Sequence, residues 1–205
     1  MDKQGELPAM SPQFADAFAW ADHLHAPQTR KGSTIPYISH LMIASATVIE
    51  HGGNEDQAIA ALLHDAAEDQ GGKPRLDQIR RRFGDAVADI VDVCTDTFDD
   101  PKPAWRPRKE AYLKRLRNAT AGARLVAAAD KLHNFSTTRD DLRREGDAAW
   151  AKFNASKESQ LWYFRGCVDA LSAQGVTPLV AKVAAVVAEI ETLARTAGKK
   201  SSRKT

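Results

Sequence analysis

The chain has 205 residues, of which 43% are hydrophobic and 27% are charged, and its formal net charge at pH 7 is +2. These values fit one globular domain with its own hydrophobic core, and the charge is too small to require a nucleic-acid partner. No apolar run approaches the roughly 20 residues that span a bilayer, so we expect no membrane partner. Two distant cysteines and an N-terminus without a signal-peptide pattern predict a reducing, cytoplasmic location.

Helical patterns separated by loops rich in glycine and proline fill the first half of the chain. Apolar side chains at helical spacing predict helices over 11–25 and 38–51. Asn54 is placed to cap a third helix, which we expect to run through residue 69. The breaks after these three helices are marked by Pro27, Gly32 and Pro36, by Gly52 and Gly53, and by Gly71, Gly72 and Pro74.

The second half also follows helical spacing, so the sequence predicts an all-α bundle. Short helices are expected over 76–83 and 86–94, and the proline-rich stretch 99–107 predicts an irregular or partly mobile loop. Further helical patterns cover 108–119, the segment around Asp130, 147–173 and 177–196. We expect one domain over residues 8–196 and a disordered basic tail over 197–205.

One face of the third predicted helix is strongly polar. Four of its side chains fall within an arc of about 140° at 3.6 residues per turn, and they are His64, Asp65, Glu68 and Asp69. The opposite face is apolar and carries Ile59, Leu62, Leu63, Ala66 and Ala67. A polar face of this kind is ordinarily a solvated surface, because Asp and Glu are mostly exposed.

Asp130 argues against a merely solvated face. It ends the apolar run 125–129, where a carboxylate is costly unless a cation or hydrogen bonds compensate it. We therefore predict one divalent metal site formed by two imidazoles and two carboxylates, from His40, His64, Asp65 and Asp130. Mixed nitrogen and oxygen ligands suit Mn, Fe or Zn better than Ca or Mg, and manganese or iron is preferred here.

The acidic pair one turn further along is predicted to do chemistry and not to bind the metal. Glu68 is placed to take a proton from a water, and Asp69 is placed to orient that water or to assist. Arg30 and Lys31 precede the loop that delivers His40, so phosphate binding is favoured over a plain solvated turn. Lys109 lies near an expected helix start, where an anionic partner and simple exposure are equally good explanations.

Three blocks of the sequence occur in a characteristic order. They read Arg30-Lys31-Gly32 with Pro36-Tyr37-Ile38-Ser39-His40, then Ala61-Leu62-Leu63-His64-Asp65-Ala66-Ala67-Glu68-Asp69, then Ala129-Asp130-Lys131-Leu132-His133-Asn134. This order resembles the HD phosphohydrolase superfamily and, more narrowly, the hydrolase domain of the Rel/Spo alarmone enzymes. The resemblance covers roughly residues 12–173.

The resemblance implies an HD-domain helical bundle that removes the 3′-pyrophosphate of guanosine tetra- and pentaphosphate with one bound Mn²⁺, with Fe or Zn as alternatives. It implies that the four predicted ligands hold the metal and that Glu68 and Asp69 are the catalytic pair. The implied substrate contacts are Arg30, Lys31, Lys131 and Asn134, to which we add Lys109. The longer members continue into a synthetase domain where this chain ends, so we expect a small alarmone hydrolase.

Two departures from the resemblance bear on substrate choice more than on chemistry. Gln70 stands where Thr commonly follows the acidic pair, and the stretch 97–106 does not match the longer enzymes. An HD phosphohydrolase acting on an adenosine alarmone, NADPH or a nucleoside monophosphate is therefore an alternative. An antitoxin-type module that clears or binds alarmone is another, and a nucleic-acid binder is the weakest.

Overall fold

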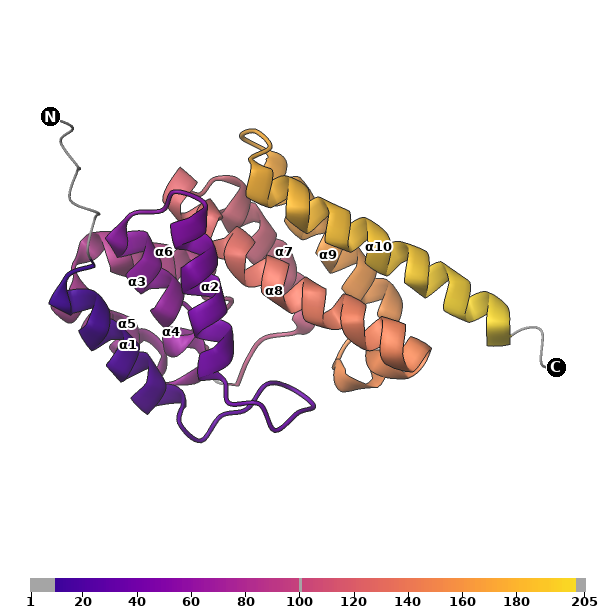
Figure 1. The fold of residues 1–205 in the computed structure, drawn as a ribbon, viewed down its shortest axis with the longest axis horizontal. Coiled ribbons are helices and arrows are strands. Elements are labelled where there is room, and N and C mark those ends of the chain that lie inside the picture. Colours follow the sequence, from indigo (N-terminus) through magenta and orange to yellow (C-terminus); the bar gives the residue numbers. More distant parts are fainter. Residues whose placement is uncertain (1–9, 100, 202–205) are drawn as a thin grey trace, which may run out of the picture.

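The computed structural model describes residues 10–99 and 101–201. Short helices with clear start signals make up the first half of the fold (Figure 1). Ser11 accepts a hydrogen bond from the Gln13 amide at the start of the first helix, and Asn54 forms a capping box with Gln57, as predicted for Asn54. The helices are α1 (Pro12–His25), α2 (Ile38–Glu50), α3 (Glu55–Leu63), α4 (Ala66–Asp69), α5 (Gly72–Phe83) and α6 (Asp85–Cys94).

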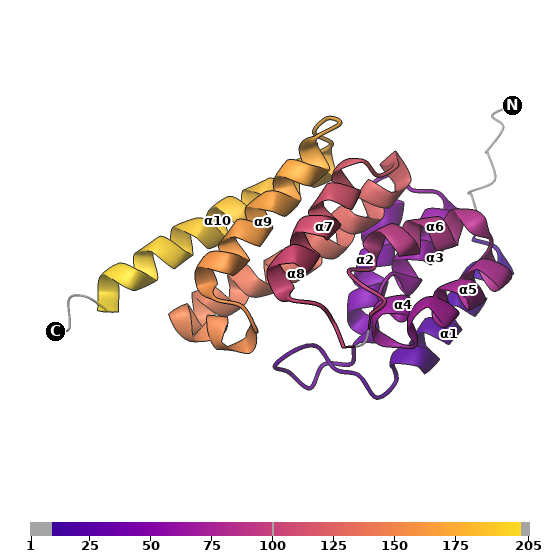
Figure 2. The same ribbon diagram turned by 180° about the vertical axis from the view of Figure 1, so that it is seen from behind.

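A long central helix joins this half to the rest of the bundle. The second half contains α7 (Trp105–Arg117), α8 (Ala121–Glu145), the 3₁₀ helix η1 (Gly146–Lys152), α9 (Lys157–Ser172) and α10 (Pro178–Ser201). Helix α8 contacts α2, α3 and α6 through one part of its surface and α10 through another. In the view from behind, α7 and α9 lie side by side in front of α8 (Figure 2).

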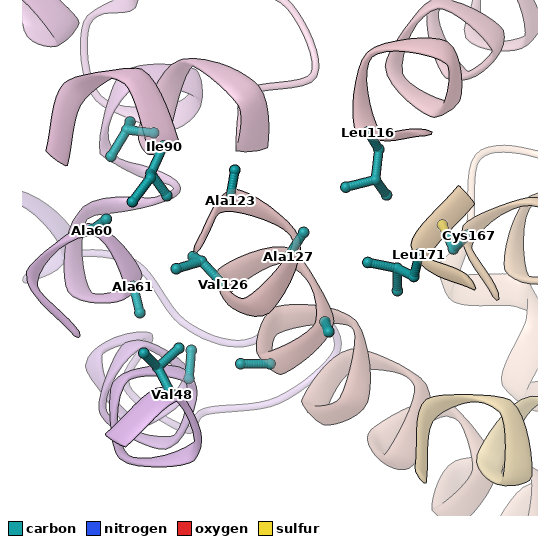
Figure 3. Close-up of a cluster of buried hydrophobic side chains, with 14 of the residues drawn as sticks. Val48, Ala60, Ala61, Ile90, Leu116, Ala123, Val126, Ala127, Cys167 and Leu171 are labelled. Carbon is teal, nitrogen blue, oxygen red and sulfur yellow. The ribbon is translucent and has the colours of Figure 1, made fainter. Parts of the chain in front are cut away.

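The first half of α8 is the middle of the hydrophobic core. Its small side chains at position 123 and over 126–129 are buried and let neighbouring helices approach closely (Figure 3). Val126 faces the side of α2 and α3, where Val48 and Ala61 lie, whereas Ala127 faces Leu171 of α9. Asp130 follows directly on this apolar stretch, so packing delivers its carboxylate to the interior.

The prediction of an all-α fold is confirmed. Among the residues that the structure describes, the backbone outside the helices forms one isolated bridge, between Thr29 and Pro36, and no strand. Within the same residues, no helix combines the length and apolar character needed to cross a membrane.

The prediction of one continuous helix through residue 69 is wrong. Helix α3 ends at Leu63, and His64 and Asp65 form a turn before α4 begins at Ala66. The His64 imidazole Nδ1 donates to the carbonyl oxygen of Ala61 at 2.8 Å, and this carbonyl would accept the Asp65 amide in a continuous helix. The turn keeps right-handed backbone angles, so both side chains still point toward α8.

Three other predicted boundaries shift. Helix α5 begins at Gly72 and not at residue 76, because Pro74 is tolerated in a first helical turn. Helix α7 likewise begins at Trp105 and takes Pro107 into its first turn, which shortens the predicted 99–107 loop. The helix expected over 147–173 is divided into η1 and α9.

The end of the chain is also more regular than expected. Helix α10 runs to Ser201, so the backbone of the first part of the predicted tail, 197–201, is helical. Residues 202–205 lie outside the described part of the chain. The predicted domain limits of 8–196 stay a prediction.

Candidate metal and catalytic site

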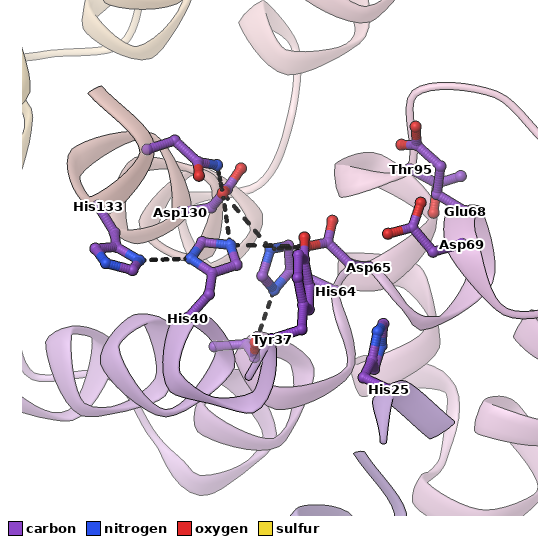
Figure 4. A network of polar contacts seen from close by, with 12 residues as sticks. His25, Tyr37, His40, His64, Asp65, Glu68, Asp69, Thr95, Asp130 and His133 are labelled. Atoms are coloured by element: carbon purple, nitrogen blue, oxygen red, sulfur yellow. Dashed lines mark hydrogen bonds and ion pairs between the residues drawn. The ribbon is translucent and has the colours of Figure 1, made fainter. Parts of the chain in front are cut away.

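The structure brings the four predicted metal ligands around one point (Figure 4). The Nε2 atom of His40 lies 3.2 Å from Asp130 Oδ1 and 3.6 Å from Asp65 Oδ2. The Nε2 atom of His64 lies 3.0 Å from Asp65 Oδ2 and 3.6 Å from Asp130 Oδ1. One ligand atom each from His40, His64 and Asp65 falls within 4.8 Å of the others. The four side chains come from α2, from the turn after α3 and, for Asp130, from α8.

In their neutral forms, the two imidazoles can each offer the Nε2 lone pair to a metal ion. Both Nε2 atoms are buried and have no hydrogen-bond partner within the described residues. The Nδ1 atom of His64 donates to the Ala61 carbonyl at 2.8 Å, which leaves the lone pair on Nε2. The Nδ1 atom of His40 lies 2.6 Å from Nδ1 of His133. A divalent cation between these groups would satisfy both orphaned nitrogens, so the residues fit a metal site.

The charges around this point also favour a cation. Although burial opposes ionisation, the His64 imidazole beside Asp65 and the Lys131 ammonium beside Asp130 hold the pKa values of both carboxyls below their usual range. Burial lowers the pKa of His40. Burial disfavours a charged His64, but the two carboxylates raise its pKa well above the ordinary value. A cation that binds here displaces that proton.

The predicted catalytic pair lies beyond Asp65, away from His40 (Figure 4). Glu68 is half-buried, and its Oε1 accepts from Lys102 Nζ at 2.7 Å while its Oε2 accepts from the Asp96 amide at 3.0 Å. Asp69 Oδ2 accepts from Gln28 Nε2 at 2.9 Å. Desolvation and the nearby Asp65 carboxylate raise the pKa of Asp69. The pair thus lies at the edge of the site, and its role in proton transfer stays a prediction.

Comparison with known proteins agrees with this geometry. Residues 17–160 match the family described as HD domain. The chain belongs to the HD domain family. The guanosine-3′,5′-bis(diphosphate) 3′-pyrophosphohydrolases MESH1 of Mus musculus and Homo sapiens are 33% and 32% identical to this HD domain over 143 residues, or 68% of this chain and 75% of each relative. The GTP pyrophosphokinase of Streptomyces antibioticus is 34% identical over 135 residues, which are 65% of this chain and 16% of that enzyme.

Solved structures show the same fold. A metazoan ortholog of SpoT that hydrolyses ppGpp superposes with a TM-score of 0.71 at 24% identity, covering 90% of this chain and 98% of that one. The lmo0812 protein from Listeria monocytogenes EGD-e gives a TM-score of 0.64 at 27% identity, covering 72% of this chain and 96% of that one. These structures agree with the sequence matches, which make this HD domain a phosphohydrolase related to MESH1.

A second layer of hydrogen bonds orients the candidate ligands of the HD domain. Tyr37 donates its hydroxyl to Asp65 Oδ2 at 2.6 Å. Asp130 Oδ2 accepts a hydrogen bond from Lys131 Nζ at 2.6 Å, and Asp130 Oδ1 accepts one from Asn134 Nδ2 at 2.5 Å. Burial, with a smaller contribution from the neighbouring His40 and Arg30, lowers the pKa of His133 to about 4, so this imidazole is neutral and can accept the His40 Nδ1 proton. Partners of this kind typically orient metal ligands.

Replacing Tyr37 with phenylalanine should weaken metal binding by about 10- to 100-fold, the usual effect of losing such an outer partner. The ring and its packing remain, and only the hydrogen bond to Asp65 is lost. Calorimetric titration of metal into the metal-free protein measures the affinity. Tyr112→Phe is the matched control, because the Tyr112 ring is also buried and its hydroxyl makes no hydrogen bond to a ligand among the described residues. Equal affinities for both variants would contradict the orienting role.

The predicted substrate-binding residues fall into two groups. The first group lies next to the candidate ligands. Asn134 and Lys131 contact Asp130 as described above, and Arg30 Nη2 donates to Asn134 Oδ1 at 2.7 Å. Lys31 lies with its Nζ 5.7 Å from the centre of the Phe153 ring. The anionic partner of Lys109 in the structure is Asp96, at 2.8 Å, so a phosphate contact for Lys109 stays a prediction.

The sequence did not predict several residues that line the site. His25 and His133 are hydrogen-bonded, and both lie beside the site. Asp96 and Lys102 come from the segment between α6 and α7 that showed no recognisable pattern. Within the quoted blocks, His133 follows Asp130 by three positions and Tyr37 precedes His40 by three. This closeness in sequence was the only signal that pointed to these outer residues.

Proposed function

We propose that this HD domain is a manganese-dependent guanosine-3′,5′-bis(diphosphate) 3′-pyrophosphohydrolase. The observation that carries the proposal is the pair of orphaned, buried imidazole nitrogens facing two carboxylates, with the acidic pair of α4 at its edge. MESH1, which is related over 75% of its length, bears this activity in its name. Hydrolysis would release pyrophosphate and leave a 3′-hydroxyl on the ribose.

The metal would be held by His40, His64, Asp65 and Asp130. When bound, it would supply Lewis acidity toward the phosphoryl group and the attacking water. Two imidazoles and two carboxylates favour manganese or iron, with zinc as the alternative. The proposal includes the cytoplasmic location predicted from the sequence.

The remaining roles belong to side chains around the metal. Glu68 would take the proton of the attacking water, and Asp69 would orient that water. Arg30 and Lys31 would neutralise phosphates of the nucleotide, with Lys131, Asn134 and Lys109 as further contacts. The half-buried position of Glu68, one turn from the ligand Asp65, supports the first of these roles.

A substrate panel tests the proposal. Purified protein loaded with manganese is incubated with guanosine and adenosine 3′-pyrophosphates, NADPH and nucleoside monophosphates, and the products are separated by ion-exchange chromatography. We expect pyrophosphate and guanosine diphosphate from guanosine tetraphosphate, and no turnover after chelation. Release of a single phosphate, or inertness toward all 3′-pyrophosphates, would overturn the proposed substrate and leave a phosphohydrolase of another specificity.

Replacing Arg30 with alanine should mainly raise KM. A charged hydrogen bond to phosphate is worth roughly 1.5 to 3 kcal/mol and acts on the bound substrate and the transition state together. The loss should be larger for nucleotides with both 5′ and 3′ phosphates than for a monophosphate. Steady-state kinetics with each substrate measure it, and Arg81→Ala, an exposed arginine on α5, is the control. An equal loss across all substrates would assign Arg30 a structural role through Asn134.

A further inference from the structure

The side-chain amide of Gln28 is held at both ends. Its Oε1 accepts from His25 Nδ1 at 2.7 Å and from Gln70 Nε2 at 3.0 Å, and its Nε2 donates to Asp69 Oδ2 at 2.9 Å. A carboxylate can only accept, so Asp69 fixes the nitrogen end of the Gln28 amide, and the oxygen end then accepts from Gln70 and His25. The same logic places the proton of His25 on Nδ1. The donor end of Gln28 is therefore turned toward Asp69.

Both anchors of this amide are themselves fixed. His25 is buried at the end of α1, and its ring stacks on that of Tyr37 with centroids 5.1 Å apart. Gln70 follows α4, and its carbonyl oxygen accepts from Arg75 Nε at 2.9 Å. The Arg75 guanidinium in turn lies 5.3 Å from the centre of the Trp20 ring. Gln28 is thus tied to the helical core on two sides.

Asp69 needs such a partner because it lies at the exposed edge of the site. A free aspartate side chain there would sample several rotamers, and catalysis requires a defined geometry. We propose that Gln28 is a positioning residue for Asp69 and that Gln70 acts through Gln28. The amide holds Oδ2, and Oδ1, which accepts no hydrogen bond within the described residues, would serve as the acceptor for water. This inference rests on the proposed function, in which Asp69 orients the attacking water.

The partners of Gln28 are separate from the candidate metal ligands (Figure 4). His25 and Asp69 lie on the same side of Asp65, away from His40 and His133. Within the described residues, neither amide donates to a candidate ligand side chain. Changing the amides should therefore alter the catalytic step without changing metal content.

Kinetics of Gln28→Met provide the first test. Methionine has a similar length but makes no hydrogen bond to Asp69, so kcat should fall roughly 10- to 100-fold, as small misplacements of catalytic groups typically do. KM and metal stoichiometry should stay at their wild-type values. Gln174→Met is the matched control, because Gln174 is an exposed glutamine that donates to Arg117 and Ala119 carbonyls. An unchanged kcat in Gln28→Met, or a loss that follows lost metal, would overturn the proposal.

A double-mutant comparison tests the role of Gln70. Gln70→Thr shortens the side chain and should lower kcat less than Gln28→Met does. If Gln70 acts through Gln28, the double variant should be no slower than Gln28→Met alone. Losses that simply multiply would show that Gln70 acts independently.

An NMR measurement without substrate separates this inference from the proposed function. The side-chain amide signal of Gln28 is the pair of resonances that disappears in Gln28→Met. Asp69→Asn should shift that signal, whereas Asp85→Asn, at an exposed position on α6, should not. If Asp69→Asn shifts the Gln28 signal but the wild-type protein hydrolyses no 3′-pyrophosphate, the Gln28 contact is supported and only the proposed substrate is rejected. If Asp69→Asn does not shift the Gln28 amide signal, the contact between Gln28 and Asp69 is rejected.

Discussion

Replacing Glu68 with glutamine should lower kcat by about 10²- to 10⁴-fold, the usual contribution of general acid and base catalysis. Glutamine keeps the size of the side chain and one oxygen that can accept from the Asp96 amide, but it cannot take a proton from water. Metal content should not change, because the Glu68 oxygens accept from Lys102 and from the Asp96 amide and, within the described residues, contact no candidate ligand. Pyrophosphate release and metal analysis on the same sample measure the two effects.

Glu110→Gln is the matched control for this experiment. Glu110 is exposed and pairs with Arg106 at 2.7 Å, so it loses the same charge and a comparable ion pair at a remote position. Wild-type turnover is expected for this variant, since exposed pairs contribute little to stability. Turnover of Glu68→Gln close to that of the control would remove Glu68 from proton transfer and leave Asp69 as the candidate base.

His64→Ala and Asp130→Asn should each abolish stoichiometric metal binding. The four candidate ligands join three separate segments of the fold, so metal bound to the native state stabilises it. At a metal concentration of 100 times Kd this contribution is about 2.7 kcal/mol, which corresponds to roughly 5–10 °C in Tm for a chain of this size. The variants should lose this metal-dependent increase, and metal analysis by mass spectrometry gives the stoichiometry.

The informative quantity is the change in Tm on adding metal and not Tm itself. Asp130→Asn leaves the Lys131 ammonium without its carboxylate partner, so the metal-free variant is destabilised for a separate reason. His23→Ala, at an exposed histidine of α1, should keep the full metal-dependent increase. One tightly bound ion per chain in both ligand variants would show that the ligands are wrongly assigned.

Local sequence patterns predicted most helices because helical periodicity and caps act over a few residues. Asn54 capped the helix where expected, and the apolar run before Asp130 became the core of α8. Several of the errors lay at prolines and at His64. A proline in a first turn is compatible with a helix, and the bond from His64 to the Ala61 carbonyl interrupts the helix in a way that residue spacing does not reveal.

The types of residue in the three blocks, and their order, carried the family resemblance and predicted the metal chemistry, because a carboxylate next to an apolar run is costly unless a cation or hydrogen bonds compensate it. Only the tertiary structure decided which groups surround that chemistry. Gln28 reaches Asp69 and Lys102 reaches Glu68 across 41 and 34 positions of the chain. The packing of α1, α4 and the segment after α6 sets such contacts, and no local pattern encodes a contact between distant segments.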